Sequence, residues 1–433
     1  MRTAQLPDWT NRLARSVALT AAFAVAAFGC GFGAQVFEWH PIGGSAIPGE
    51  QGAATLPARI GAPAAWTPDL EDAPIGAASI LYSSNTWFPN GSDGLGALVG
   101  RGDDTYRVTG LSGPAGMGSV LSPDGARLAS SDGIVDLATG EVSGWGPQWG
   151  DHVSVEPEAW SPDGRTVAVL AGDHLDPGLA SDTTKLYLYD VSGGTPREVA
   201  ELNRVVAMSG WTAAFSPDGT RLAYQNDGRL SVLTLAGATT ADVPIPAGAR
   251  LAGRGAWTRD GRNLLVTTGA PCDCGGHPMR WTVTAISATD GTATGTVYSR
   301  DGSYALRVLG WWPSGRPVAV EYTPVEGTEA TIFDKPGPQY DLASQEQIKA
   351  ARLIDLGAGT ILTDGDEWGL AGDVESIDVA DSVLARGEIR SGSAPLFDAD
   401  GILVTVLGIV ALALLILVFL GAWRSVATLT RRR

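Results

Sequence analysis

Three residues between positions 272 and 277 have the spacing of a small metal or redox centre. Cys272, Cys274 and His277 form a C-x-C-x-x-H pattern. Thiolates and imidazole are ligands that zinc accepts, although this pattern supplies only three of the usual four. Outside the cytoplasm thiols tend to oxidise, so a Cys272–Cys274 disulfide is the alternative and free thiols are the third. The pattern therefore predicts a reactive site whose nature the spacing leaves open.

Aromatic and histidine residues in the longer connections between apolar runs are further candidates for ligand binding. Exposed aromatic side chains favour binding surfaces, and imidazole beside carboxylates suits a cation. Solvated loop side chains are the plainer interpretation of the histidines at 152 and 174. The candidate binding residues are Trp87, Phe88, Trp149, His152, His174, His277, Phe333 and Tyr340.

Catalytic motifs give no support for an enzyme. The sequence holds no G-x-S-x-G elbow, no G-x-x-x-x-G-K-[ST] phosphate loop and no H-E-x-x-H zinc helix. Carboxylates are plentiful, but spacing alone selects no glycosidase pair. We therefore expect no bound cofactor, and the sequence favours a binding protein over an enzyme.

The charge of the chain is unevenly distributed. Residues 1–37 carry +2 and residues 401–433 carry +4, which leaves −23 for residues 38–400 of the total of −17. A domain this acidic is unsuited to the phosphate backbone of nucleic acids. We expect no nucleic-acid partner.

Each basic end adjoins a long apolar segment. Residues 16–37 and 402–423 are 22-residue runs without a charged side chain, and about 20 apolar residues suffice to cross a bilayer. Arg424 and the three arginines at 431–433 follow the second run, so the positive-inside bias places the C-terminus in the cytoplasm. The first run is either an uncleaved anchor, which we favour, or a signal peptide.

A short motif recurs through the middle of the chain. An apolar residue precedes Ser-Pro-Asp-Gly and a second apolar run follows it at residues 121–125, 160–164 and 215–219, with looser copies at 257–261 and 312–315. Proline and Asp-Gly are turn residues, and the flanking apolar runs are typical of paired strands. Four short strands per repeat predict an all-β fold, a β-propeller of about six blades, with seven as the alternative.

The repeat resembles that of TolB-type, WD-like propellers. The W/F-S-P-D-G-x-x-[LV]-A unit and a following D-x-x-x-G turn carry the resemblance over residues 60–390. It implies a module that interacts with other proteins outside the cytoplasm, or that gates a fused peptidase. Residues 75–110 are expected to form a blade without the motif, and residues 374–386 to supply its missing strand.

The connections between second and third strands differ in length. Short Asp-Gly turns at 132–133 and 227–228 contrast with insertions at residues 84–95, 171–184, 269–280 and 323–350. In a propeller these connections share one face, and function concentrates on loops carried by a rigid scaffold. The sequence therefore predicts a binding face that carries the four insertions; neutral drift of loop length is the alternative.

The expected organisation places one large domain between two membrane helices. The segments are a cytoplasmic N-terminus (1–15), an anchor or signal (16–37), a linker and propeller entry (38–73), the propeller (74–390), a linker (391–401), a transmembrane helix (402–423) and a basic cytoplasmic tail (424–433). We predict a membrane-tethered, extracytoplasmic scaffold in a bacterial cell envelope that binds a protein, a peptide or a cell-wall ligand. The alternatives are a glycan- or lactone-type hydrolase with a metal in the central tunnel, and a sensor that acts through a membrane partner.

Overall fold

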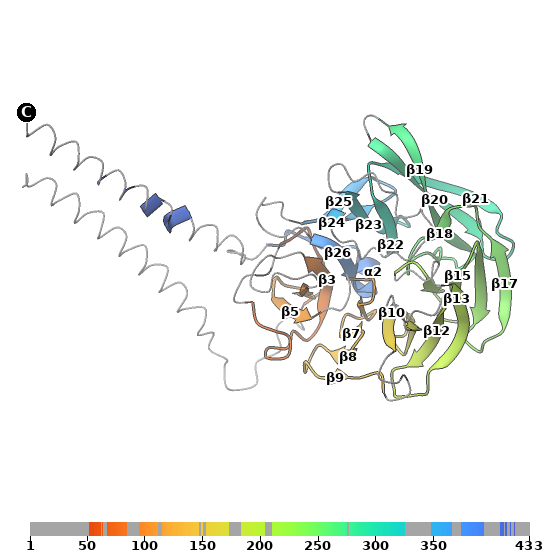
Figure 1. Ribbon diagram of the computed structural model, residues 1–433, viewed down its shortest axis with the longest axis horizontal. Helices are drawn as coiled ribbons and strands as arrows, with labels where there is room; N and C mark the ends of the chain where they lie inside the picture. Colours follow the sequence, from red (N-terminus) through yellow and green to blue (C-terminus); the bar gives the residue numbers. More distant parts are fainter. Residues whose placement is uncertain are drawn as a thin grey trace, which may run out of the picture. The chain divides into compact units, whose positions relative to one another are not determined.

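The computed structural model describes most of residues 52–393. The described residues are 52–61, 63, 67–84, 95–110, 115–146, 149, 153–172, 183–203, 210–274, 277–324, 348–365, 374–393 and seven helical residues between 408 and 420. The strands among them form six sheets of four or five strands, arranged as a ring (Figure 1). The all-β propeller and its six blades are thus confirmed, and the alternative of seven is not.

Blades 1 to 3 come from the first half of the chain and its C-terminal end. Blade 1 contains β26 (Val374–Val379), β3 (Ala78–Ser84), β4 (Leu95–Gly100) and β5 (Tyr106–Gly110). Blade 2 contains β6 (Val120–Leu121), β7 (Arg127–Ser130), β8 (Gly133–Asp136) and β9 (Val142–Ser143). Blade 3 contains β10 (Ser154–Trp160), β11 (Thr166–Gly172), β12 (Thr183–Asp190) and β13 (Arg197–Asn203).

Blades 4 to 6 follow in chain order. Blade 4 contains β14 (Ala213–Phe215), β15 (Arg221–Asn226), β16 (Arg229–Thr234) and β17 (Thr239–Pro244). Blade 5 contains β18 (Ala249–Leu251), β19 (Asn263–Cys274), β20 (His277–Ser287) and β21 (Ala293–Asp301). Blade 6 contains β22 (Ala305–Trp311), β23 (Pro317–Pro324), β24 (Ile348–Asp355), β25 (Thr360–Gly365) and β2 (Arg59–Ile60).

The ring is closed by the C-terminal part of the propeller. β26 pairs antiparallel with β3, with Ile377 opposite Tyr82, so the predicted missing strand of blade 1 is confirmed. The prediction is wrong for the second half of that segment, because Asp381–Arg386 is helix α2 instead of strand. Closure removes an open sheet edge that would otherwise expose unpaired backbone groups.

A second closure is made by the N-terminal segment 52–76, which we call the strap. β1 (Leu56–Pro57) pairs in parallel with β27 (Ile389–Arg390), and β2 adds to the outer edge of blade 6. The strap then pairs with β5 of blade 1, where Leu70 donates its amide hydrogen to the carbonyl of Val108 at 2.8 Å. The strap therefore holds the outer edges of the two blades between which the ring closes.

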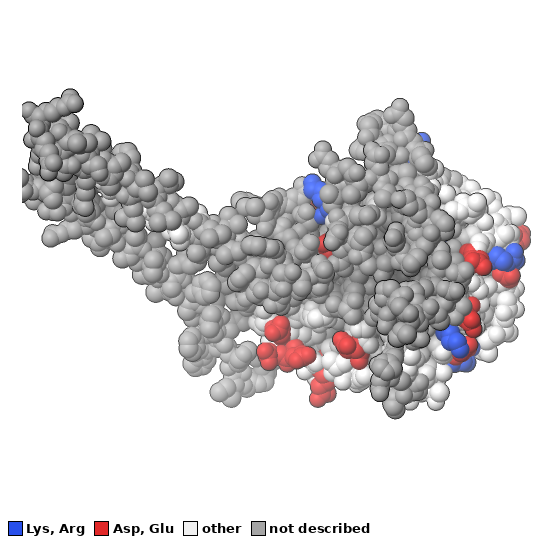
Figure 2. All heavy atoms as spheres, in the orientation of Figure 1, with Lys and Arg blue, Asp and Glu red and all other residues white. Residues whose placement is uncertain are grey.

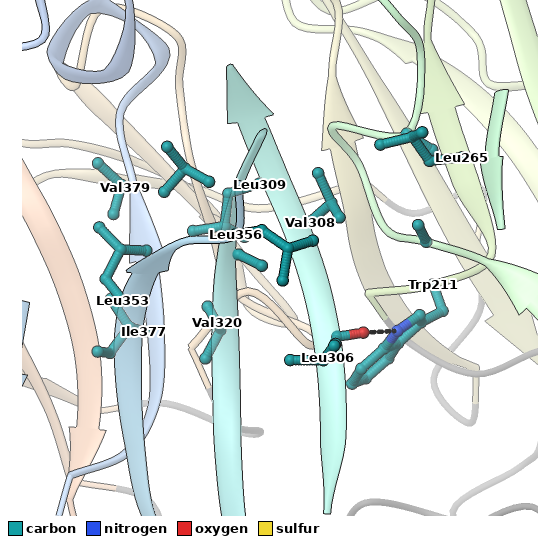
Figure 3. Close-up of a cluster of buried hydrophobic side chains, with 14 of the residues drawn as sticks. Trp211, Leu265, Leu306, Val308, Leu309, Val320, Leu353, Leu356, Ile377 and Val379 are labelled. Carbon is teal, nitrogen blue, oxygen red and sulfur yellow. Dashed lines mark hydrogen bonds between the residues drawn. The ribbon is translucent and has the colours of Figure 1, made fainter. Parts of the chain in front are cut away.

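The core lies between blades, where strands are buried on both faces. All seven residues of β3 and all six of β26 are buried, including the polar Glu375, Ser376 and Asp378 of β26. Figure 3 shows the core of blade 6 and its neighbours, with Leu306, Val308 and Leu309 on β22, Val320 on β23, Leu353 on β24, and Ile377 and Val379 on β26.

An arginine links two pairs of neighbouring blades in the same way. Arg127 of blade 2 lies 5.2 Å from the ring centroid of Trp160 in blade 3, and its Nη2 donates to the carbonyl of Gly164 at 2.8 Å. Arg221 of blade 4 repeats this arrangement on blade 5, at 4.5 Å from Trp257 and 2.7 Å from the carbonyl of Gly261. We call this arrangement the Arg–Trp latch.

The flanking membrane helices are not present in the described part of the chain. Residues 16–37 lie outside it, and only residues 408–410, 412, 413, 416 and 420 of the second segment are described, all as helix. No helix among the residues that the structure describes is long and apolar enough to span a bilayer.

Candidate functional site

The two faces of the propeller are built differently. The motif face carries the turns after the first and third strands of each blade. The other face, which we call the inserted face, carries the ends of the second and fourth strands and the starts of the first and third. The chain between these strand ends at residues 85–94, 111–114, 173–182, 204–209, 325–347 and 366–373 lies outside the described residues. The grouping of the insertions on this face stays a prediction, with which the directions of the bordering strands are consistent.

The motif turns share one hydrogen-bond pattern. In the blade 4 copy, Ser216 donates to the carboxylate of Asp218 at 2.5 Å, and its hydroxyl accepts from the amide of Arg221 at 2.9 Å. The same bonds recur in blade 2 (Ser122, Asp124), blade 3 (Ser161, Asp163) and blade 5 (Thr258, Asp260). The Ser216 hydroxyl is the main cause that lowers the pKa of Asp218 to about 2. These turns are uniform structural units, as their sequence predicts.

The blade 6 copy departs from the predicted alignment. The motif aromatic was assigned to Trp312, but the Nε1 of Trp311 donates to the backbone carbonyl of Trp257 at 2.6 Å. Trp160 and Trp257 make the equivalent bond to the preceding blade. Trp311 therefore takes the place of the motif aromatic, four positions before Gly315 as Trp160 is before Gly164, and Trp312 takes the place of Ser161.

Helix α2 covers the axis on the motif face, as Figure 1 shows at the centre of the ring. Val383 and Leu384 are buried, and the amide of Ser382 donates to the carbonyl of Pro123 in blade 2 at 2.8 Å. The helix also packs on β22, where a side chain at Gly310 would meet Leu384. The motif face is thereby closed at its centre.

A buried ion pair joins three blades beneath this helix. Arg254 of blade 5 contacts the fully buried Asp378 of β26 at 3.1 Å, and Asp378 accepts the amide hydrogen of Leu121 in blade 2 at 2.8 Å. Burial alone would lower the pKa of Arg254, but Asp378 and then Asp381 raise it well above its ordinary value. The arginine thus stays charged, and the pair ties the closing strand to both sides of the ring.

The axis itself is filled near the inserted face by Arg307, which the sequence analysis did not identify. Its guanidinium is fully buried and donates to the carbonyls of Ala115 and Gly116 at 3.1 Å and of Ile377 at 2.7 Å. Its Nε donates to the hydroxyl of Tyr322 at 3.0 Å. These partners come from blades 1, 2 and 6, so only a position on the axis can reach all of them.

Small residues allow this packing. A Cβ at Gly116 would lie 2.2 Å from the guanidinium of Arg307, and one at Gly210 would lie 2.6 Å from the carbonyl of Gly116. Trp211 closes the blade 4 side, where its Nε1 donates to the carbonyl of Leu306 at 3.1 Å (Figure 3). A lone arginine inside an acidic domain is not recognisable as an axial residue from sequence, because no local pattern marks it.

The arrangement bears on the alternative of a metal in the central tunnel. Among the described residues no group of three or more metal-ligating side chains gathers. More directly, the centre is occupied by a buried guanidinium, and a cation bound beside it would meet strong repulsion. The axis of this propeller is therefore packed with side chains, with the Arg307 guanidinium towards one end and the Arg254–Asp378 pair towards the other.

The predicted binding residues fall mostly outside the described chain. These are Trp87, Phe88, His152, His174, Phe333 and Tyr340. Trp149 is described: its ring meets that of Tyr187 edge-on at 4.8 Å, and its Nε1 donates to the carbonyl of Trp145 at 3.2 Å. Trp149 is thus half-buried between blades 2 and 3, at the edge of the inserted face.

The predicted loop at residues 269–280 is instead regular structure, and this expectation was wrong. β19 and β20 continue through it as a long hairpin, seen at the top of Figure 1. Cys272 and Cys274 lie on β19, and His277 opposite Cys274 on β20. The pairing of β19 with β20 continues from Asn263 opposite Ser287 to Cys274 opposite His277. The side chains of these three residues are outside the described set, so zinc, disulfide and free thiol stay open.

Comparison with known proteins bears on the fold. No family model matches the chain, and no curated protein matches its sequence. TolB from Acinetobacter baumannii is 16% identical with a TM-score of 0.30, over 57% of this chain and 51% of that one. A protein described as TolB from Agrobacterium tumefaciens is 20% identical with a TM-score of 0.33, over 66% and 86%. An oligogalacturonate lyase solved with manganese is 14% identical with a TM-score of 0.38, over 62% and 70%.

These likenesses support no statement about activity. The chain spans about half the length of the Acinetobacter protein, and the identities are low. The TolB-like propeller expected from the motif is confirmed as regards the fold, because six blades are present and the motif turns lie between first and second strands. The assignment rests on the strand pairing of this chain.

Proposed function

We propose that this chain is a membrane-tethered, extracytoplasmic β-propeller that binds a protein or another cell-envelope ligand on its inserted face. One observation carries the proposal. The strands that border residues 85–94, 173–182 and 325–347 end and begin at the same face, on which we infer that these connections lie, whereas the opposite face is closed by α2 and by uniform, hydrogen-bonded turns. Variable segments on a rigid scaffold are where binding residues concentrate.

The scaffold suits such a role because it is held rigid at both ends of its axis. Arg307 and its carbonyl partners fill one end, and the Arg254–Asp378 pair fills the other. A pre-organised surface loses little conformational freedom on binding, which favours affinity. The hydrolase alternative is not supported, since the axial position that would hold its metal carries the Arg307 guanidinium.

Membrane tethering is part of the proposal and rests on the sequence. The 402–423 segment is 22 residues without a charge and is followed by four arginines. The described residues of this segment are helical, and Ile409, Val410 and Leu412 are half-exposed or more. Apolar side chains exposed on a helix require a partner, and a bilayer is the partner that such a length fits.

Site-specific photocrosslinking in intact cells tests the binding face. A photoreactive amino acid is introduced at Trp87 or Tyr340 on the inserted face, with the exposed Thr139 of a motif-face turn as the matched control. We expect the first two positions to yield the same discrete adduct and position 139 to yield none. Adducts at position 139 alone, or the same adducts at all three positions, would contradict the assignment of the face.

A further inference from the structure

Blades 5 and 6 meet through the same geometry as the latched blades, but without the arginine. Asn263 occupies the position of Arg127, because its amide donates to Thr258 Oγ1 at 3.0 Å as that of Arg127 does to Ser122 Oγ at 2.9 Å. Trp311 occupies the position of Trp160, since both donate Nε1 to a carbonyl of the preceding blade. Gly315, with φ of 80°, occupies the position of Gly164.

A pocket opens where the guanidinium would lie. Its lining includes Asn263, Trp311 and Gly315, the three counterparts of the latch, together with Asp260 and Tyr298. A Cβ at Gly164 would lie 3.3 Å from the Nη2 of Arg127, and one at Gly261 would lie 3.1 Å from that of Arg221. At Gly315 no atom of the described chain lies within 4 Å of such a Cβ.

The junction between blades 3 and 4 differs from the junction between blades 5 and 6, which keeps the tryptophan of the latch and lacks only the arginine. There both partners of the latch are replaced, by Thr166 at the arginine position and Phe215 at the tryptophan position. Between blades 5 and 6 only the cation is replaced. The aromatic ring and the glycine carbonyl are retained, and the space that the arginine fills at the latched junctions is open.

We propose that the pocket between blades 5 and 6 binds an arginine side chain of a partner protein, which completes the latch from outside. The guanidinium would stack on Trp311 and donate to the carbonyl of Gly315, as Arg127 does on Trp160 and Gly164. The carboxylate of Asp260 and the guanidinium of Arg259 both line the pocket, so their formal charges cancel and the stacking and the carbonyl carry the recognition. Nη1 of Arg259 donates to the carbonyl of Pro313 at 3.0 Å.

The chemistry selects arginine over other cations. A planar guanidinium stacks on an indole and donates to a carbonyl in its own plane at once, which a lysine ammonium cannot do. The pocket opens on the motif face, so this site is independent of the inserted face on which the proposed function rests.

Saturation-transfer NMR on the purified full-length chain tests the proposal. The probes are a peptide Ala-Ala-Arg-Ala-Ala, its lysine and citrulline counterparts, and free arginine. We expect the arginine peptide to bind and the citrulline peptide, which lacks the charge, not to bind. In Asn263→Arg the protein's own side chain fills the pocket, and the affinity for the arginine peptide should fall at least about tenfold.

Two further variants keep the result interpretable. Thr166→Arg places an arginine at the equivalent position between blades 3 and 4 and should leave binding unchanged. Trp311→Leu removes the half-exposed ring without filling the pocket and should abolish binding, so it decides the matter if Asn263→Arg folds poorly. Equal binding of the arginine peptide to wild type and both pocket variants would overturn the site. Tighter binding of free arginine than of the peptide would overturn a protein as its source.

Discussion

At the scale of single residues, the propeller is assembled from a few side chains that do the same task in several blades. The Ser-Pro-Asp-Gly turn could be predicted from sequence in full, because each of its residues has a local reason to be there. Serine and aspartate satisfy backbone amides within five residues, and glycine takes a positive φ of 65° to 74° in the four closest copies. The axial Arg307 could not be predicted, since its partners lie about 70 and 190 positions away.

The aspartates of the motif turns predict that the stability of the fold depends on pH in the acidic range. The pKa of Asp218 is lowered from 3.8 to about 2, first by the Ser216 hydroxyl and then by the amide of Thr220. A carboxyl whose pKa is lower in the folded state stabilises fully above 3.8, and this contribution is lost as the pH falls towards 2. We expect the melting temperature of Asp218→Asn to lie below that of wild type at pH 5, with a difference that narrows towards pH 2. A difference that is constant with pH would show that the ionised carboxylate is not the cause.

The Arg–Trp latch predicts that removing its arginine lowers the free energy of unfolding by a measurable amount. Arg127→Met keeps the aliphatic stem but removes the stacked charge and the hydrogen bond to Gly164, so we expect unfolding to become easier by about 1–2 kcal/mol. Arg165→Met, at an exposed turn position in the next blade, is the matched control and should change the free energy by less than about 0.5 kcal/mol. Urea titration of both variants is the measurement. Equal effects would mean that the latch adds nothing beyond a surface charge.

At the scale of elements, the structure differs from the sequence-based expectation where pairing partners are remote. β3, β4 and β5 could be predicted from their own apolar runs. β26 could be predicted because blade 1 otherwise has only three strands. The hairpin of β19 and β20 was mistaken for a loop because Pro271 and two glycines at 275 and 276 have the character of turn residues. Cross-strand pairing overrides that local preference up to the tip. α2 and the strap carry no such signal, since each is defined by the blades that it contacts.

The strap predicts that a short strand outside the motif region stabilises the ring. Ile60 of β2 is fully buried against blade 6, and Ile→Ala at a buried site costs about 2–5 kcal/mol. We expect Ile60→Ala to lower the free energy of unfolding within that range and to speed amide exchange in β25, which pairs with β2. Arg59→Ala, on the exposed side of the same strand, is the control. Exchange that increases everywhere equally would argue against a local role in closure.

At the scale of the whole molecule, charge separates one acidic domain from two basic ends. Figure 2 shows acidic side chains on the described surface of the propeller, one group of them without basic neighbours and others beside lysine or arginine. Acidic and basic side chains mixed over the whole chain would keep the protein equally soluble. The basic residues that flank the apolar segments 16–37 and 402–423 are the part of this pattern to which the positive-inside bias applies.

This arrangement predicts the side of the membrane on which each part lies. A reporter that is active only outside the cytoplasm, fused after Arg433, should be inactive, and the same reporter inserted between residues 325 and 347 should be active. We propose that Arg424 and the arginines at 431–433 keep the C-terminus inside, so their combined replacement by glutamine should raise the activity of the C-terminal fusion. The insertion between 325 and 347 is the internal control, because its signal should not change. Activity of both reporters in the unaltered chain would refute the predicted topology, since the acidic domain and the C-terminus would then lie on the same side of the membrane.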